Sequence, residues 1–127
     1  MAKVIDASAV LAFLYNEPGA EKVKPDLAEG RISAVNAAEV LSVLVRNKVP
    51  QAAALLAFEK TGLRVVDFSR GSAIETLALV TPAARSRRLS LGDRACLALA
   101  LAEKLPVVTA DGNWSGLSGE LQIEPIR

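Results

Sequence analysis

The chain has 127 residues, of which 51% are hydrophobic and 23% charged, and its formal net charge at pH 7 is +1. This length suits one domain covering residues 1–127, and the composition excludes disordered, collagen-like and low-complexity proteins. No uncharged stretch exceeds ten residues, whereas a membrane-spanning helix needs roughly 20, so we expect no membrane span.

Short apolar runs alternate along the chain with segments of helical periodicity. We expect strands at residues 3–5, 31–34, 63–66 and 106–109, and a short edge strand at 121–124. We expect helices at residues 8–15, 19–29, 37–47, 50–60, 69–85 and 93–104, the second interrupted by Pro25 and the fifth by Pro82. This alternation predicts a three-layer α/β/α fold, with helices on both faces of a mostly parallel central sheet of four to five strands.

The sequence contains no histidine and one cysteine, Cys96. Without histidine, the usual serine or cysteine triads are excluded, and zinc has no ordinary ligand set. A bound metal would therefore be held by oxygen, which favours Mg²⁺ or Mn²⁺. Asp6 interrupts the apolar start of the chain, so we expect no secretory signal. Cys96 cannot form an internal disulfide, which predicts a buried, unreactive thiol in a reducing cytoplasm.

Four carboxylates are expected at the edge of the sheet where strands end and the following helices begin. Asp6 ends the first strand, and Asp111 follows the strand that closes with Thr109. Glu39 and Asp93 are expected in the first turns of their helices. Ligands of parallel sheets bind at this edge. Because like charges 4 Å apart repel by ~1–4 kcal/mol, converging carboxylates require a cation to neutralise them.

Each acid also has a simpler structural interpretation. The segments Asn36–Glu39 and Ser90–Asp93 have the spacing of helix capping boxes. Asp6 is placed to cap the next helix, and Asp111 precedes a glycine as in an ordinary turn. Two features favour a shared site instead: Asp93 lies on the core-facing stripe of its helix, and Asp6 directly follows two apolar residues.

Four short motifs occur in a fixed order along the chain. They are Val-Ile-Asp6-Ala-Ser8, Ala-Ala-Glu39-Val, Leu-Ser-Leu-Gly-Asp93-Arg and Val-Val-Thr109-Ala-Asp111. In this order they resemble the PIN-domain ribonucleases, and within them the VapC toxins of bacterial and archaeal toxin–antitoxin pairs. The resemblance covers the whole chain. It departs after Asp111, where a bulkier, often Phe-containing run would be expected and Trp114 is predicted to anchor the core instead.

The resemblance carries expectations for activity, partners and site residues. It implies endonucleolytic cleavage of RNA that depends on Mg²⁺ or Mn²⁺, a homodimer, and inhibition by a cognate antitoxin. The metal-binding acids of the family match Asp6, Glu39, Asp93 and Asp111, and the supporting positions match Ser8, Asn36 and Thr109.

Other functions also fit a sheet of this type. A receiver-like phosphoacceptor module needs paired acids after the first strand, but Asp6 is followed by Ala7 and Ser8. It also needs a lysine after a late strand, and none follows Thr109 in its motif. Within the PIN family, routine RNA processing or non-catalytic RNA binding is an alternative to toxicity. The presence of all four acids favours catalysis.

Two surface features predict contacts with partners. The first is a cluster of arginines around the third motif, which we expect to contact RNA phosphates: Arg85, Arg87, Arg88 and Arg94. The second is the apolar character of the helices at residues 37–47 and 50–60. Because a small monomer buries such residues only in part, we expect a twofold dimer through these helices.

Overall fold

The computed structural model describes residues 1–127 and contains one parallel sheet of five strands, in the order β3-β2-β1-β4-β5. The strands are β1 (Val4–Ile5), β2 (Arg31–Ser33), β3 (Arg64–Val66), β4 (Val107–Thr109) and β5 (Ile123–Pro125). All four strand pairs are parallel. The predicted parallel sheet is therefore confirmed, and the expected last strand lies at the edge as β5.

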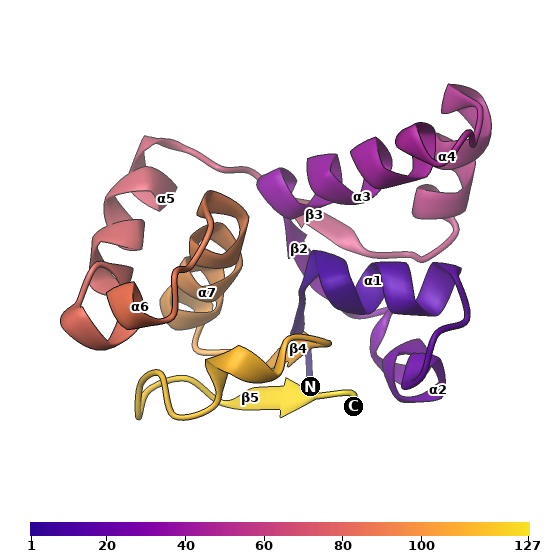
Figure 1. The fold of residues 1–127 in the computed structure, drawn as a ribbon. Helices are drawn as coiled ribbons and strands as arrows, with labels where there is room; N and C mark the ends of the chain where they lie inside the picture. Colours follow the sequence, from indigo (N-terminus) through magenta and orange to yellow (C-terminus); the bar gives the residue numbers. More distant parts are fainter.

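Helices cover both faces of this sheet, as predicted. They are α1 (Ala7–Leu14), α2 (Ala20–Val23), η1 (Lys24–Asp26), α3 (Ala34–Arg46), α4 (Gln51–Glu59), α5 (Arg70–Glu75), η2 (Thr76–Leu79), α6 (Pro82–Ser86), α7 (Leu91–Glu103) and η3 (Gly112–Trp114). Figure 1 shows α1 to α4 on one side of the sheet and α5 to α7 on the other. None of the helices has both the length and the apolar character needed to cross a membrane.

Two hydrophobic cores hold the three layers together. Ile5 and Val108 pack with the apolar residues of α1, α3 and α4, whereas Val4 and Val107 pack with those of α7. Neighbouring residues of β1 and β4 thus point to opposite faces, and both faces are buried, as is usual for central parallel strands. Trp114 is fully buried in the second core, which confirms its predicted role as an anchor under the last loop.

The helix expected at residues 69–85 is present in three pieces, α5, η2 and α6, and the expected interruption falls directly before Pro82. Ser69 begins α5 through a capping box with Ser72. Thr81 begins α6 by accepting a hydrogen bond from the Ala84 amide at 3.2 Å, and Pro82 occupies the first turn. Proline is favoured in a first turn, where its missing N–H has no partner to lose, so Pro82 starts a helix here rather than disturbing one.

Helix α3 begins three residues earlier than expected, and this changes the position of Glu39. Ser33, the last residue of β2, caps the helix by accepting a hydrogen bond from the Val35 amide at 3.2 Å. Glu39 therefore lies in the second turn of α3, and the interpretation of Asn36–Glu39 as a capping box is wrong. Asn36 instead faces the same way as Glu39, one turn before it.

The strand order places the candidate site. The chain runs outward from β1 to β2 and β3, and then returns to β4 on the other side of β1. The point between β1 and β4 is therefore the topological switch point, where open α/β sheets bind ligands. Asp6 follows β1 there and Thr109 ends β4. The receiver-like alternative does not fit this topology, because sheets of that type have the order 2-1-3-4-5.

Candidate active site

Asp6 is the buried carboxylate at the centre of the site, with 5% of its surface exposed. It precedes α1 but makes no capping hydrogen bond, so the capping interpretation of Asp6 is wrong. Its Oδ2 instead accepts hydrogen bonds from Ser8 Oγ at 2.5 Å and from Thr109 Oγ1 at 3.0 Å. Two hydroxyl groups, one from α1 and one from β4, thus orient the carboxylate.

The same two hydroxyls join the start of α1 to the chain that leaves β4. The Ala110 amide donates a hydrogen bond to Ser8 Oγ at 2.9 Å. The Asp111 amide donates one to Thr109 Oγ1, also at 2.9 Å. Ser8 and Thr109 therefore position Asp6 and the backbone of the β4 exit together.

Asn36 connects Glu39 on α3 to the first turn of α7. It is fully buried, and its Nδ2 donates hydrogen bonds to Glu39 Oε1 at 2.7 Å and to the Gly92 carbonyl at 3.0 Å. The Glu39 carboxylate lies directly over Gly92: a Cβ at this glycine would lie 2.7 Å from Glu39 Cδ and 2.8 Å from Oε2. The only sequence signal for Gly92 is a glycine inside the first turn of a helix, next to Asp93.

Asp93 lies in the first turn of α7 and forms the expected capping box. Its Oδ2 accepts a hydrogen bond from the Ser90 amide, and its own amide donates to Ser90 Oγ, both at 3.0 Å. The capping interpretation of Ser90–Asp93 is thus confirmed. It does not remove Asp93 from the site, because only one carboxylate oxygen is used in the cap.

The three carboxylates of β1, α3 and α7 affect one another electrostatically. The pKa of Asp6 is raised from 3.8 to about 6, mainly because burial disfavours the charged form and further because of the negative charges of Asp93 and Glu39. The hydrogen bonds from Ser8 and Thr109 act in the opposite direction and lower this pKa. The structure therefore brings Asp6, Glu39 and Asp93 into one neighbourhood.

Cys96 lies beneath these three carboxylates and is fully buried, as the sequence predicted. The pKa of its thiol is raised well above its usual value, mainly by burial and then by the charges of Asp6, Asp93 and Glu39. A thiol held in this protonated form is a poor nucleophile.

Asp111 lies apart from the other three acids. Its Oδ1 accepts a hydrogen bond from the Asn113 amide at 2.8 Å and so caps η3, which confirms the turn interpretation. Its charge is not among the causes of the raised pKa of Asp6. Asp111 therefore stands at the rim of the cluster, half-buried, and is tied to it through Thr109.

The oxygen atoms of the cluster fit a hard divalent cation. Asp6, Glu39 and Asp93 each use one carboxylate oxygen in hydrogen bonds from hydroxyl or amide groups, which leaves Glu39 Oε2 and Asp93 Oδ1 without a donor. The buried Oδ1 of Asn36 also lacks a donor. None of the four predicted acids forms an ion pair. The cluster thus has a surplus of acceptors and no cation of its own, which suits Mg²⁺ or Mn²⁺.

The carboxylate oxygens of Asp6, Glu39 and Asp93 are not arranged around a common metal-binding position. No group of three or more acidic, histidine or cysteine side chains is arranged to hold a single ion. The local hydrogen bonds explain this, because Asn36 holds Glu39 and the Ser90 amide holds Asp93. Side-chain rotation is therefore needed before three carboxylates can share one ion.

The four predicted RNA-binding arginines differ in what they contact. The Arg87 guanidinium donates to three backbone carbonyls, at Ala83, Asn113 and Ser115, at distances of 3.0 to 3.3 Å. Arg94 Nε donates to the Ser90 carbonyl at 3.4 Å. The exposed guanidinium groups of Arg85 and Arg88 have no protein partner. Arg87 therefore ties α6 to the loop around η3, whereas Arg85 and Arg88 face solvent.

Comparison with known proteins gives one family and a consistent fold. The model of the PIN domain family matches residues 3–119. A chain in the DNA-bound VapBC structure from Salmonella typhimurium is similar over 100% of both chains, with a TM-score of 0.75 and 19% identity. A chain in a toxin–antitoxin complex from Klebsiella pneumoniae is similar over 98% of both chains, with a TM-score of 0.76 and 16% identity.

A third similar chain comes from the structure of VapBC-5 of Mycobacterium tuberculosis, a member of the VapBC family of toxin–antitoxin systems. It has 27% identity to this chain and a TM-score of 0.66, and the similarity covers 99% of this chain and 98% of that one. No curated protein matches the sequence. The family expected from the four motifs is confirmed. Because the family model spans nearly the whole sequence and the α/β/α fold agrees with it, this chain belongs to the PIN domain family.

Proposed function

We propose that this protein is an endoribonuclease that depends on Mg²⁺ or Mn²⁺ and acts as the toxin of a toxin–antitoxin pair. The observation that carries the proposal is the proximity of Asp6, Glu39 and Asp93 beside the switch point of a PIN-domain sheet. A divalent cation bound there would neutralise the charge that develops on a phosphodiester and lower the pKa of an attacking water.

The residues of the chain have distinct parts in this reaction. Asp6, Glu39 and Asp93 would hold the ion through the carboxylate oxygens that Ser8, Asn36 and the Ser90 amide do not use. Ser8, Thr109 and Asn36 orient these carboxylates by occupying the opposite oxygens. Asp111, at the rim, would complete the site or orient the attacking water.

The toxin role is supported by the similar structures, which are toxin–antitoxin complexes. A cognate antitoxin would inhibit the enzyme by placing a short segment in the acid-lined groove, where an arginine of that segment neutralises the carboxylates. A toxin that cleaves cellular RNA would act in the cytoplasm, in keeping with the single free Cys96. A small reading frame co-transcribed directly upstream would distinguish this role from routine RNA processing.

The catalytic proposal is tested with purified protein and single-stranded RNA. We expect cleavage that requires Mg²⁺ or Mn²⁺ and stops with EDTA, and Asp93→Asn should lower its rate by at least ~100-fold because one ligand charge is lost. Asp67→Asn is the matched control, since Asp67 is an exposed acid that follows β3, which lies two strands from β1 in the sheet. Cleavage by Asp93→Asn at the wild-type rate would contradict the site. RNA binding without cleavage by the wild type would favour the non-catalytic alternative.

Arg88 is proposed to contact RNA phosphates, and its effect is measured as a change in salt dependence. Arg88→Ala should reduce the slope of log K against log salt concentration by ~1, because one phosphate contact is lost. Arg87→Ala should instead lower the thermal stability, since it removes the hydrogen bonds between α6 and the η3 loop. If the salt slope of Arg88→Ala equals that of the wild type, Arg88 does not contact RNA and is only a solvated surface residue.

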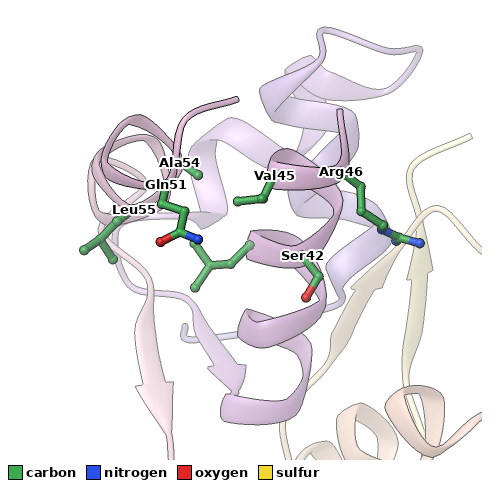
Figure 2. A pocket seen from close by; sticks show the side chains of 7 residues that line it. Ser42, Val45, Arg46, Gln51, Ala54 and Leu55 are labelled. Atoms are coloured by element: carbon green, nitrogen blue, oxygen red, sulfur yellow. The ribbon is translucent and has the colours of Figure 1, made fainter. Parts of the chain in front are cut away.

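A twofold dimer is proposed through the apolar residues of α3 and α4 that the monomer leaves exposed. Leu55 and Leu56 are 48% and 53% exposed, whereas Val40, Leu44 and Phe58 are buried in the first core. A groove of about 650 Å³ lies between the two helices, and Val45, Arg46 and Leu55 are among the residues that line it (Figure 2). The exposed leucines, not the whole apolar surface of both helices, would therefore form the contact.

Light scattering tests this dimer. The wild type should be dimeric at micromolar concentration, and the double variant Leu55→Asp/Leu56→Asp should be monomeric. Leu77→Asp is the control, because Leu77 is an even more exposed leucine on η2, the element whose Leu79 packs in the second core. A monomeric wild type would contradict the proposal.

A further inference from the structure

A second groove leads away from the acid cluster between α1 and α3. It has a volume of about 430 Å³ and is lined beyond Ser8 by Leu11, Tyr15, Glu17, Val43, Asn47 and Arg127. One end begins at Ser8, whose hydroxyl is bonded to Asp6. The groove thus begins at a residue that orients Asp6, although none of the four motifs includes its far end.

The helical spacing shows why the groove starts at the acids. On α1, Ser8, Leu11 and Tyr15 follow one another at intervals of three and four residues, so they share one face. On α3, Val43 and Asn47 continue the face that carries Glu39, at intervals of four. The seven residues from Ser8 to Tyr15 correspond to roughly 10 Å along α1. A strand that enters at the acids therefore reaches Tyr15 within about three stacked nucleotides.

The far end of the groove presents an aromatic ring and an amide. Tyr15 is 42% exposed, and Asn47 Nδ2 donates a hydrogen bond to its hydroxyl at 3.0 Å. This bond joins α1 to α3 across the groove and orients the ring. The Asn47 Oδ1 accepts no hydrogen bond, and the Tyr15 hydroxyl donates none. Leu11 and Val43 supply an apolar lining between this pair and the acids.

The far end of the groove carries one acid and one base, Glu17 and Arg127, whose charges offset each other. Glu17 lies within 3.6 Å of the Arg127 guanidinium, and that guanidinium also donates to the Pro18 carbonyl at 3.1 Å. Arg46 and Lys48, on either side of Asn47 in the sequence, form no ion pair. Neither of these two residues lines the groove, so a polyanion leaving the acid cluster would meet a lining without net charge, in which Glu17 offsets Arg127.

We propose that this groove binds the RNA strand next to the scissile phosphate, with a base stacked on Tyr15 and hydrogen-bonded to Asn47. Single-stranded RNA is recognised in this way, by stacking on aromatic rings and by hydrogen bonds to base edges. Arg127 closes the groove beside the neighbouring phosphate. This inference rests on the proposed nuclease function, and it makes Tyr15 and Asn47 residues that position substrate rather than catalytic residues.

The test compares Tyr15→Leu with Tyr15→Phe, which keeps the ring. Binding of a short fluorescent single-stranded RNA is measured in EDTA, so that the result does not depend on cleavage. Tyr15→Leu should weaken binding about tenfold, from the loss of stacking, and Tyr15→Phe should stay within about threefold of the wild type. In cleavage assays, Tyr15→Leu should raise KM by a similar factor and leave kcat nearly unchanged. Thermal unfolding checks that both variants fold.

An abasic scan locates the contact. Replacing one nucleotide at a time by an abasic residue should weaken wild-type binding most at one position near the cut, and Tyr15→Leu should show no further loss at that position. Equal binding of the RNA by wild type and Tyr15→Leu overturns the inference, even where Asp93→Asn confirms the nuclease. A Tyr15→Leu variant that loses binding only to a partner protein also overturns it. Failure of the wild type to bind RNA overturns the inference and the proposed function together.

Discussion

Asp6→Asn is expected to stabilise the metal-free protein at pH 7 by about 2–3 kcal/mol while abolishing metal-dependent RNA cleavage. The stabilisation follows because Asp6 is buried beside Asp93 and Glu39, with a pKa raised to about 6. Asparagine removes the charge, and its side-chain oxygen still accepts the hydrogen bonds from Ser8 and Thr109. A ligand of a metal centre is thus expected to destabilise the fold when no metal is bound.

The pH dependence has a definite sign. The folded state holds the Asp6 proton more tightly than the unfolded state does, since its pKa of about 6 exceeds the ordinary value of 3.8. The contribution of Asp6 to stability is therefore fully present below the unfolded pKa and is lost as the pH rises through the folded pKa. In EDTA, the free energy of unfolding of the wild type should fall between pH 4 and pH 7 relative to that of Asp6→Asn.

Urea denaturation in EDTA at several pH values measures this difference. Asp67→Asn serves again as the control, and its stability should follow that of the wild type because Asp67 is exposed. Adding Mg²⁺ or Mn²⁺ should raise the stability of the wild type but not that of Asp6→Asn, since only the former binds the ion. An Asp6→Asn variant no more stable than the wild type in EDTA at pH 7 would contradict the electrostatic argument.

The strands of the sheet could be predicted from the sequence because each strand is marked by its own short apolar run. The segments Val4–Ile5 and Val107–Val108 are apolar on both faces, which is typical of parallel strands covered on both sides. The break of the helix expected at residues 69–85 does not follow in the same way. Thr81 and Pro82 fit the start of a new helix as well as the disturbance of an old one, and the packing of Leu79 and Ala84 in the second core decides between them.

The sequence predicts those residues of the site that lie at the ends of strands, such as Asp6 and Thr109. Asp6 and Thr109 meet because β1 and β4 are neighbours, which the alternation of strands and helices implies only in part. The role of Asn36 depends on where α3 begins, and Ser33 sets this at the very end of β2. Its link to Gly92 spans 56 residues and leaves no local signal. The hydrogen bonds from Arg87 to the carbonyls of Asn113 and Ser115 also join distant parts of the chain and leave no local signal in the sequence.

Gly92→Ala should lower cleavage by at least ~10-fold without destabilising the fold. The added Cβ would lie 2.7 Å from Glu39 Cδ, so the Glu39 carboxylate must move away from the first turn of α7. This side chain can move because it is exposed on α3, although the movement breaks its hydrogen bond from Asn36. Alanine favours a helix over glycine by up to ~1 kcal/mol, so thermal stability should be unchanged or higher. Activity and stability would then change in opposite directions.

Gly71→Ala is a closely matched control. Gly71 and Gly92 each follow a capping serine by two residues, in α5 and α7, and both serines form capping boxes. A Cβ at Gly71 meets only Ser69 Oγ, at 3.5 Å. Gly71→Ala should therefore gain stability from the higher helix propensity of alanine and keep full activity. If displacement of Glu39 is the cause, Gly92→Ala should cause little further loss in a Glu39→Gln background. Full activity in Gly92→Ala would instead show that the Glu39 carboxylate is not needed where the structure places it, over the first turn of α7.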